Sequence, residues 1–463
     1  MPSTRPSAPP SDSSTGLDPL RRSLADERMT RFQWVVVAVC VLVNTLDGFD
    51  IQVMAFTSNA VTKEFGLSGS QLGLLLSAGF VGMAAGSLLI APFADRVGRR
   101  PIVLACLVIA AVGMTLSAMT QSAEQLGLLR VLTGLGIGGI LASNTVIAGE
   151  YASRRWHGMT IALTATGYSV GAIVGGILSV TLQSSFGWRS VFLFGGLATA
   201  AVLVLAAFLL PESLDHLLTR QPPRALDRVN RLARRMGRAP LDALPAKPPR
   251  TARGVAGGLR KLLGPELRRS TLILWVGFFL VLAGFYFVTS WTPRLLVEAG
   301  LTPGAGISGG VLINIGGLFG SVALGFFTAR FAMRKVVFGY LLTSAVMLAL
   351  FITTVGSLPL ALCVAALIGL FLIGCVAGLY ALVTAVYDAD VRATGMGTAV
   401  GIGRIGAIIA PIAAGALLDG GWTPNALYVS IAVAFAVTAV VLLALRTSDP
   451  RAVDSPAAAG ANR

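Results

Sequence analysis

The sequence is poor in charge and in chemically reactive side chains. Only 12% of its 463 residues are Asp, Glu, Lys or Arg, and it contains just two His and four Cys. A water-soluble domain carries about 25% charged residues, so this scarcity excludes that class. With 55% hydrophobic residues and a mean hydropathy of +0.78, the chain is suited to a lipid bilayer.

The few reactive side chains do not form a recognisable catalytic or metal pattern. His157 and His216 fall between apolar stretches, and the sequence has neither a nucleophile elbow nor a metal-ligand cluster. The cysteines lack CxxC spacing and lie in apolar stretches, so we interpret them as small hydrophobes; they are Cys40, Cys106, Cys363 and Cys375. We predict no enzymatic activity, cofactor, disulfide or bound metal.

The hydrophobic residues form long runs instead of alternating with polar ones, which excludes a transmembrane β-barrel. A helix needs about 20 apolar residues to cross the hydrocarbon core. No cleavable signal peptide precedes the first run, so we expect the first membrane helix to direct targeting. We predict an all-α membrane protein with twelve spans, at 32–58, 72–94, 101–120, 125–149, 158–183, 190–210, 271–293, 307–329, 334–355, 358–386, 393–417 and 423–445.

The net charge of +15 comes from basic residues that are unevenly distributed among the loops between these spans. Basic residues gather in every second loop, and the alternate loops hold little beyond Lys63, Arg189 and Arg294. By the positive-inside rule, both termini and the long central loop are cytoplasmic and the protein spans the plasma membrane, the inner membrane of a bacterium. Topology therefore explains the basic excess, and we expect no nucleic-acid partner.

The central loop divides the chain into two sets of six spans. Its sequence "ALDRVNRLARRMGR" places Leu226, Val229, Leu232 and Met236 on one helical face, which suits either a helix on the membrane surface or a solvated linker helix. We predict a monomer with a disordered N-terminus at 1–31, a half at 32–210, a linker at 211–270, a half at 271–446 and a tail at 447–463.

The two halves also share a motif. "APFADRVGRR" follows the second span, and "GFFTARFAMR" follows the eighth, so that Arg96 matches Arg330 and Arg100 matches Arg334. Internal repeats of this kind are common in secondary transporters, which place the substrate between the halves. Through "ADRVGRR" and its second copy, the chain resembles the major facilitator superfamily.

Three further stretches carry a narrower resemblance. "LDGFD" lies in the first span, "PESL" follows the sixth, and "GIGRIGAIIAP" lies in the eleventh. Together they resemble the aromatic acid:proton symporter family, whose members import benzoate-type acids. The resemblance implies a gate at the cytoplasmic side, formed by Asp95, Arg96, Gly98, Arg99, Arg100 and Glu150.

Two carboxylates lie in the middle of the first span. Asp47 and Asp50 are three residues apart, so they share a helical face, and each costs about 3 kcal/mol to insert into a membrane. Two nearby carboxylates resist ionising together, so one of them can carry a proton. We interpret the pair as the proton-coupling site, with Asp50 nearer the substrate; a structural ion pair with an Arg is the alternative.

Two arginines also lie within predicted spans. A guanidinium can bind a carboxylate through two parallel hydrogen bonds, so Arg404, at the middle of its span, is our candidate for the substrate carboxylate. Its alternative role is to neutralise Asp47 or Asp50. The context "RVLTGLGIGG" of Arg130 resembles a superfamily motif linked to proton coupling, and a structural role is the alternative.

Glycines in the fourth and fifth spans favour close helix packing. Gly134, Gly136 and Gly139 match GxGxxG but lie within an apolar helix, whereas the nucleotide fingerprint needs a strand and a turn. The fifth span resembles the antiporter motif but has Ala172 where that motif has Pro, which favours uptake over efflux.

An aromatic substrate needs apolar walls and a few polar groups. Tyr286, Tyr168, Tyr380 and Asn314 are candidates within the spans, with helix packing as the alternative for each. We predict a proton-coupled importer of a small aromatic carboxylate that works by alternating access. The other possibilities are a symporter for another organic acid or a polyol, and a proton-coupled efflux antiporter.

Overall fold

The computed structural model describes residues 28–245 and 255–445. Within them lie twelve helices long and apolar enough to cross a membrane, which confirms the twelve spans. The N-terminal six are α2 (Arg31–Phe65), α3 (Gly69–Leu89), α5 (Arg99–Ser117), α6 (Ala123–Tyr151), α7 (His157–Phe186) and α8 (Arg189–Leu209). The C-terminal six are α12 (Arg268–Glu298), α13 (Pro303–Arg330), α14 (Met333–Phe351), α15 (Leu358–Val386), α16 (Ala389–Asp419) and α17 (Pro424–Leu442).

Polar caps determine where several of these helices begin. Thr30 and Ser68 each accept a hydrogen bond from the backbone N–H three residues later, and Gln33 and Gln71 complete the two capping boxes. Gly66 ends α2 in the left-handed conformation. As a result, α2 runs to Phe65, beyond the predicted span 32–58, and α3 begins at Gly69, before the predicted start at residue 72.

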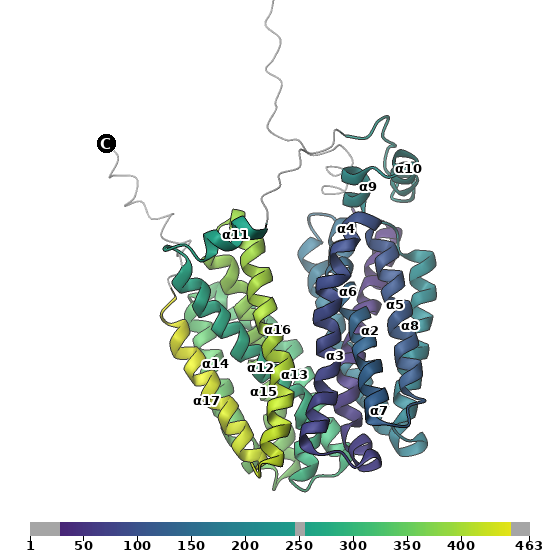
Figure 1. Cartoon of the computed structure of the whole chain (residues 1–463). Helices are drawn as coiled ribbons and strands as arrows, with labels where there is room; N and C mark the ends of the chain where they lie inside the picture. Colours follow the sequence, from purple (N-terminus) through teal and green to yellow (C-terminus); the bar gives the residue numbers. More distant parts are fainter. Residues whose placement is uncertain (1–27, 246–254, 446–463) are drawn as a thin grey trace, which may run out of the picture.

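The two sets of six helices form two bundles that lie side by side (Figure 1). The packing repeats between them: α3 packs on α6 and α5 on α8 in the first, as α13 packs on α15 and α14 on α17 in the second. Small residues permit these contacts, since a Cβ on Gly134 would lie 2.1 Å from the Gly79 oxygen. The glycines of α6 thus serve helix packing, as predicted.

Short helices occupy one end of the bundle, which we call the linker end; the other is the far end. They are η1 (Ala91–Phe93), α4 (Ala94–Val97), α9 (Leu214–Arg220), α10 (Ala225–Arg235) and α11 (Val255–Leu262). A further short helix, η2 (Ile352–Thr354), follows α14 at the far end. The apolar face of α10 is buried against α9 and the N-terminal half, since Val229 and Met236 are inaccessible. The expectation of a helix on the membrane surface is therefore wrong, because protein covers its apolar face. Its charged face, which carries Arg228, Arg231 and Arg234, is exposed, as expected for a solvated linker helix. The predicted segments 1–27, 246–254 and 446–463 lie outside the described residues.

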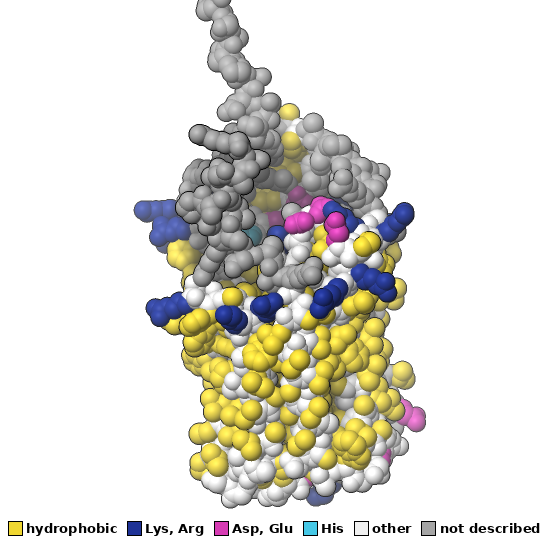
Figure 2. Space-filling model, turned by 90° about the vertical axis from the view of Figure 1, so that its left-hand side faces the viewer, with side chains coloured by type: hydrophobic (Ala, Val, Ile, Leu, Met, Phe, Trp, Pro, Cys, Tyr) yellow, Lys and Arg dark blue, Asp and Glu magenta, His cyan; other side chains and the backbone are white. Residues whose placement is uncertain are grey.

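The surface matches a protein that spans a bilayer. Figure 2 shows hydrophobic side chains over most of one face, with Lys and Arg gathered toward the linker end. Large apolar residues such as Leu88, Phe186 and Phe208 are more than 70% exposed, which suits contact with lipid and not with water.

The two halves meet along a seam, and hydrogen bonds join them across it both at the far end and near the middle of the bundle. At the far end, Asp419 of α16 accepts from the backbone N–H groups of Gly69 and Ser70, at 2.7 and 2.8 Å, where α3 begins. A negative charge at a helix N-terminus is favourable. Further along the same two helices, Ser77 Oγ donates to the Ile408 oxygen at 2.8 Å.

Candidate functional site

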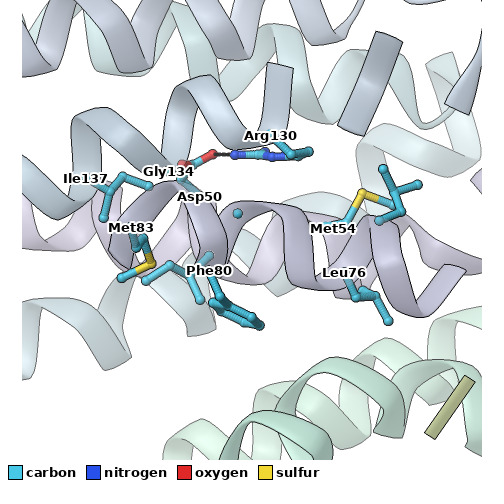
Figure 3. A pocket seen from close by; sticks show the side chains of 11 residues that line it. Asp50, Met54, Leu76, Phe80, Met83, Arg130, Gly134 and Ile137 are labelled. Atoms are coloured by element: carbon cyan, nitrogen blue, oxygen red, sulfur yellow. Dashed lines mark hydrogen bonds and ion pairs between the residues drawn. The ribbon is translucent and has the colours of Figure 1, made fainter. Parts of the chain in front are cut away.

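A buried ion pair joins α2 to α6. Arg130 Nη2 lies 2.5 Å from Asp50 Oδ1, and the two side chains are 3% and 6% exposed (Figure 3). Arg130 also donates to the Thr133 hydroxyl, and its guanidinium lies 5.6 Å from the centre of the Phe192 ring. Removing one partner of such a pair leaves an uncompensated buried charge, which is strongly destabilising. The ion pair with an arginine, which was the alternative interpretation of these carboxylates, is present between Asp50 and Arg130.

A small cavity of about 20 Å³, close to the space that one water molecule needs, lies beside this pair and is lined by α2, α3 and α6. Figure 3 shows its lining residues, among them Leu76, Phe80, Met83 and Ile137, around Asp50 and Arg130. Tyr286 and Ile408 of the C-terminal half pack against this apolar cluster. The charged pair and the apolar walls of this cavity belong to the N-terminal half, and Tyr286 and Ile408 cover them from the C-terminal half.

The second carboxylate has a different environment. Asp47 is 5% exposed, and its Oδ2 has no hydrogen-bond partner within the described ranges. It lies near enough to Asp50 and to the Tyr168 hydroxyl to interact with both electrostatically. Within the described ranges that hydroxyl is also buried without a partner. Burying a polar oxygen without a hydrogen bond is unfavourable, so Asp47 and Tyr168 are both incompletely satisfied in this conformation.

A polar network fixes the helix that carries both carboxylates. Asn44 Nδ2 donates to the Thr164 oxygen at 2.7 Å, and Asn144 Nδ2 donates to the Cys40 oxygen at 2.8 Å and to Asn44 Oδ1 at 3.1 Å. These bonds tie α2 to α7 and α6. The carboxylates are thus presented from a rigid element.

The C-terminal half contributes an arginine that contacts neither carboxylate. Arg404 Nη1 donates to the Met83 oxygen at 3.0 Å and to Ser87 Oγ at 2.5 Å, both on α3 of the other half. The alternative in which Arg404 neutralises Asp47 or Asp50 does not describe this conformation. The Arg404 charge also interacts electrostatically with the hydroxyl groups of Tyr286 and Tyr380.

The aromatic candidates occupy different surroundings. The Tyr286 ring lies 4.5 Å from the Phe80 ring across the seam, next to the cavity. Tyr380 packs edge-on against Phe278, with centroids 5.5 Å apart. Asn314 is fully buried, and its Nδ2 donates to the Gly310 oxygen of its own helix at 2.9 Å. Tyr286 is thus the tyrosine that the structure brings into the apolar cluster beside the cavity.

The residues predicted for the gate gather at the linker end around a carboxylate that we had assigned no role. Glu212 Oε1 accepts from the backbone N–H groups of Arg99 and Arg100, at 2.8 and 3.1 Å. Arg99 Nη1 lies 2.5 Å from Glu150 Oε1 and Arg99 Nη2 lies 3.8 Å from Asp95 Oδ1. We call Asp95, Gly98, Arg99, Arg100, Glu150, Glu212 and Ser213 the gate cluster.

Two members of this region explain its geometry. Gly98 has φ +118°, a conformation open to glycine, and a Cβ there would lie 2.6 Å from a Glu212 oxygen. Ser213 Oγ donates to Glu150 at 2.9 Å, so "PESL" closes the cluster. Arg96 differs from the other predicted gate residues, because it lies over the Phe93 ring at 5.8 Å.

The repeat predicted between the halves has a structural counterpart. Arg100 Nη2 donates to the Ala207 oxygen at 2.6 Å, near the end of α8. Arg334 Nη1 donates to the oxygens of Leu443 and Leu445, at 3.2 and 2.8 Å, just beyond α17. In each half, an arginine from the motif caps the last helix of that half, where a cation is favourable.

Comparisons with known proteins agree with this architecture. The family model described as Major Facilitator Superfamily matches residues 38–397 and 315–463. The partially occluded, inward-open xylose transporter XylE from E. coli shares the fold, with a TM-score of 0.68 at 14% identity, over 90% of this chain and 99% of that one. The chain belongs to the major facilitator superfamily. It is therefore a multi-pass membrane transporter and not an enzyme.

Two curated relatives extend over most of the chain. A gallate transporter of Pseudomonas putida is 35% identical over 396 residues, which cover 84% of this chain and 86% of the relative. The 4-hydroxybenzoate transporter PcaK of Pseudomonas aeruginosa is 31% identical over 421 residues, covering 90% and 93%. The resemblance drawn from "LDGFD", "PESL" and "GIGRIGAIIAP" is confirmed.

Proposed function

We propose that this protein imports a small aromatic carboxylate together with protons, by alternating exposure of one site to the two sides of the membrane. The observation that carries the proposal is the buried Asp50–Arg130 pair, which borders a small apolar cavity in the N-terminal half, where Tyr286 of the C-terminal half packs against it. Ionisable groups within membrane helices are expensive and mark transport pathways. The relatives named for gallate and 4-hydroxybenzoate support the substrate class.

The proton is proposed to bind the carboxylates of α2. Protonation of Asp50 would remove one charge of a pair whose side chains are at most 6% exposed. The Arg130 charge would then have no carboxylate to neutralise it, so the protonated and deprotonated forms of the pair differ in stability. Such a pair can couple proton binding to a change in the seam. Asp47 would serve as its electrostatic partner.

The carboxylate of the substrate is proposed to bind Arg404, across the seam from Asp50. The guanidinium is held by two uncharged oxygens, those of Met83 and Ser87. A charged, bidentate acceptor is stronger than either of them, so a carboxylate can take their place. The rings of Tyr286 and Phe80 would then form the wall against which the substrate ring packs.

The remaining elements fit the same proposal. The gate cluster would control the linker end, which we assign to the cytoplasm of a bacterium by the positive-inside rule, with the protein in the inner membrane and both termini inside. A single chain would complete the cycle as a monomer, because both halves of the seam come from it. Ala172 is fully buried on α7 and stands where the antiporter motif has Pro. This departure from the antiporter motif favours import over efflux.

Uptake into proteoliposomes tests this proposal. Labelled 4-hydroxybenzoate should accumulate when the outside is acidic, and a protonophore should abolish the accumulation. An inward proton gradient that drives substrate outward would indicate an antiporter instead. Uptake that is unaffected by both the proton gradient and the protonophore would overturn the proposed proton coupling. Absence of uptake for every acid in a panel of aromatic acids would overturn the proposed substrate class.

A further inference from the structure

Two buried polar atoms from opposite halves have no hydrogen-bond partner in the described part of the chain. They are Nε2 of Gln52 on α2 and Oδ1 of Asn314 on α13. Gln52 is 1% exposed and Asn314 is 0% exposed, so water does not satisfy them from the surface. Buried polar groups are nearly always paired, and an unpaired donor and an unpaired acceptor therefore need an explanation.

The packing of the two helices brings these side chains to one level. Phe56 lies one turn after Gln52 on the same face of α2, and Gly310 lies one turn before Asn314 on the same face of α13. A Cβ on Gly310 would lie 3.3 Å from the Phe56 ring. Because α2 runs toward the far end and α13 runs away from it, the next turn of each helix toward the middle carries Gln52 and Asn314 (Figure 1).

We propose that Gln52 and Asn314 bind a hydroxyl group on the ring of the transported acid. A phenolic hydroxyl offers one donor and one acceptor on a single oxygen, which matches the free Nε2 and Oδ1. A second carboxylate would offer acceptors alone, and a bare ring edge would offer neither. The subsite thus selects hydroxybenzoates over benzoate.

This inference rests on the proposed function, in which Arg404 takes the carboxylate of the same molecule. Gln52, Asn314 and Arg404 each lie near the middle of their helices, at a similar depth in the bundle. The proposal has one small ring present its carboxylate to Arg404 and its hydroxyl to Gln52 and Asn314. Because benzoate would leave both amide atoms unpaired, a site of this kind rejects the analogue that lacks the hydroxyl.

Calorimetric titration of the purified full-length protein in nanodiscs tests the subsite. The wild type should bind its best monohydroxybenzoate at least about tenfold more tightly than benzoate. Gln52→Met and Asn314→Leu keep the side-chain size and remove the polar atoms, so each should reduce that ratio to about twofold or less. Benzoate affinity should stay within about twofold of wild type in both.

Two control variants remove buried or half-buried hydroxyls that are already bonded within their own helices. Thr57 Oγ1 donates to the Val53 oxygen at 2.8 Å on α2, and Ser308 Oγ donates to the Gly304 oxygen at 2.9 Å on α13. Thr57→Val and Ser308→Ala should therefore leave the ratio unchanged.

The outcomes separate the subsite from the function on which it rests. An unchanged ratio in Gln52→Met and Asn314→Leu would overturn the subsite, because a water molecule would then suffice for the two atoms. Equal loss of both acids would also overturn it, since that result indicates a packing role. A wild type that binds none of the acids would overturn the proposed function first.

Discussion

Replacement of Asp50 by Asn should destabilise the protein, and a second substitution should recover the loss. The change leaves Arg130 3% exposed without its carboxylate. Breaking a buried pair by removing one partner costs about 3–5 kcal/mol. Because the Asn amide oxygen can still accept one hydrogen bond from Arg130, we expect the lower end, about 3 kcal/mol.

A double-mutant cycle measures this coupling. Arg130→Gln in the Asp50→Asn background removes the stranded charge, so the double variant should be more stable than the sum of the single changes by about 2 kcal/mol or more. The surface pair of Arg189 and Glu64 is the control, since its side chains are 37% and 41% exposed at 2.7 Å. Glu64→Gln should cost at most about 1 kcal/mol. Denaturant unfolding in detergent micelles gives all of these values.

Transport by the double variant then isolates the role of the charge. With the stranded charge removed, the double variant should exchange substrate across the membrane, because exchange needs no net proton movement. It should fail to accumulate substrate on a proton gradient. Normal gradient-driven accumulation would show that the pair is structural. Destabilisation of Asp50→Asn no larger than that of Glu64→Gln would refute the energetic argument itself.

Three further changes test the rest of the site. Asp47→Asn should keep or raise stability while proton-driven accumulation fails, because Asp47 Oδ2 has no partner among the described residues; full accumulation at normal expression would contradict this. Arg404→Lys should weaken substrate binding by about tenfold or more, measured as Kd, because Lys lacks the bidentate geometry; near-normal affinity would remove Arg404 from the site. Ser87→Ala should tighten binding about threefold to tenfold, because it removes an acceptor that competes for Arg404, whereas the control Ser77→Ala should not; weaker binding in Ser87→Ala would mean that Ser87 orients the guanidinium.

The helices could be predicted because each depends on a local property of the chain. An apolar run of about 20 residues has few alternatives to a membrane helix. The helix ends are predicted less accurately, because they depend on caps: Ser68 starts α3 before its apolar run, and Gly66 ends α2 beyond its apolar run. The face of α10 was predicted correctly as apolar, but its partner depends on how α9 folds back on the N-terminal half.

The gate cluster shows a second limit of the sequence. "PESL" was recognised as a family signature, yet nothing in its composition indicates what Glu212 contacts. Its carboxylate binds backbone N–H groups of Arg99 and Arg100, and every residue except Pro carries such a group. Because the Glu212 carboxylate pairs with backbone groups, the sequence contains no basic side chain that would identify its partner. Gly98 was the available signal, because a glycine beside an acidic motif favours close approach of another chain segment.

The assignment of partners among the buried charges depends on helix register, which the sequence leaves open. Two aspartates and two arginines within spans allow several pairings, and each would satisfy the cost of burial. Packing of α2 on α6 selects Asp50 with Arg130, while packing of α3 on α16 gives Arg404 the oxygens of Met83 and Ser87. The two halves therefore differ in charge: the N-terminal half contains a neutralised ion pair, and the C-terminal half contains a guanidinium whose described partners are uncharged. A carboxylate that enters the seam therefore meets one arginine already neutralised by Asp50 and one that is not, so the anion should bind Arg404 before it can disturb the pair.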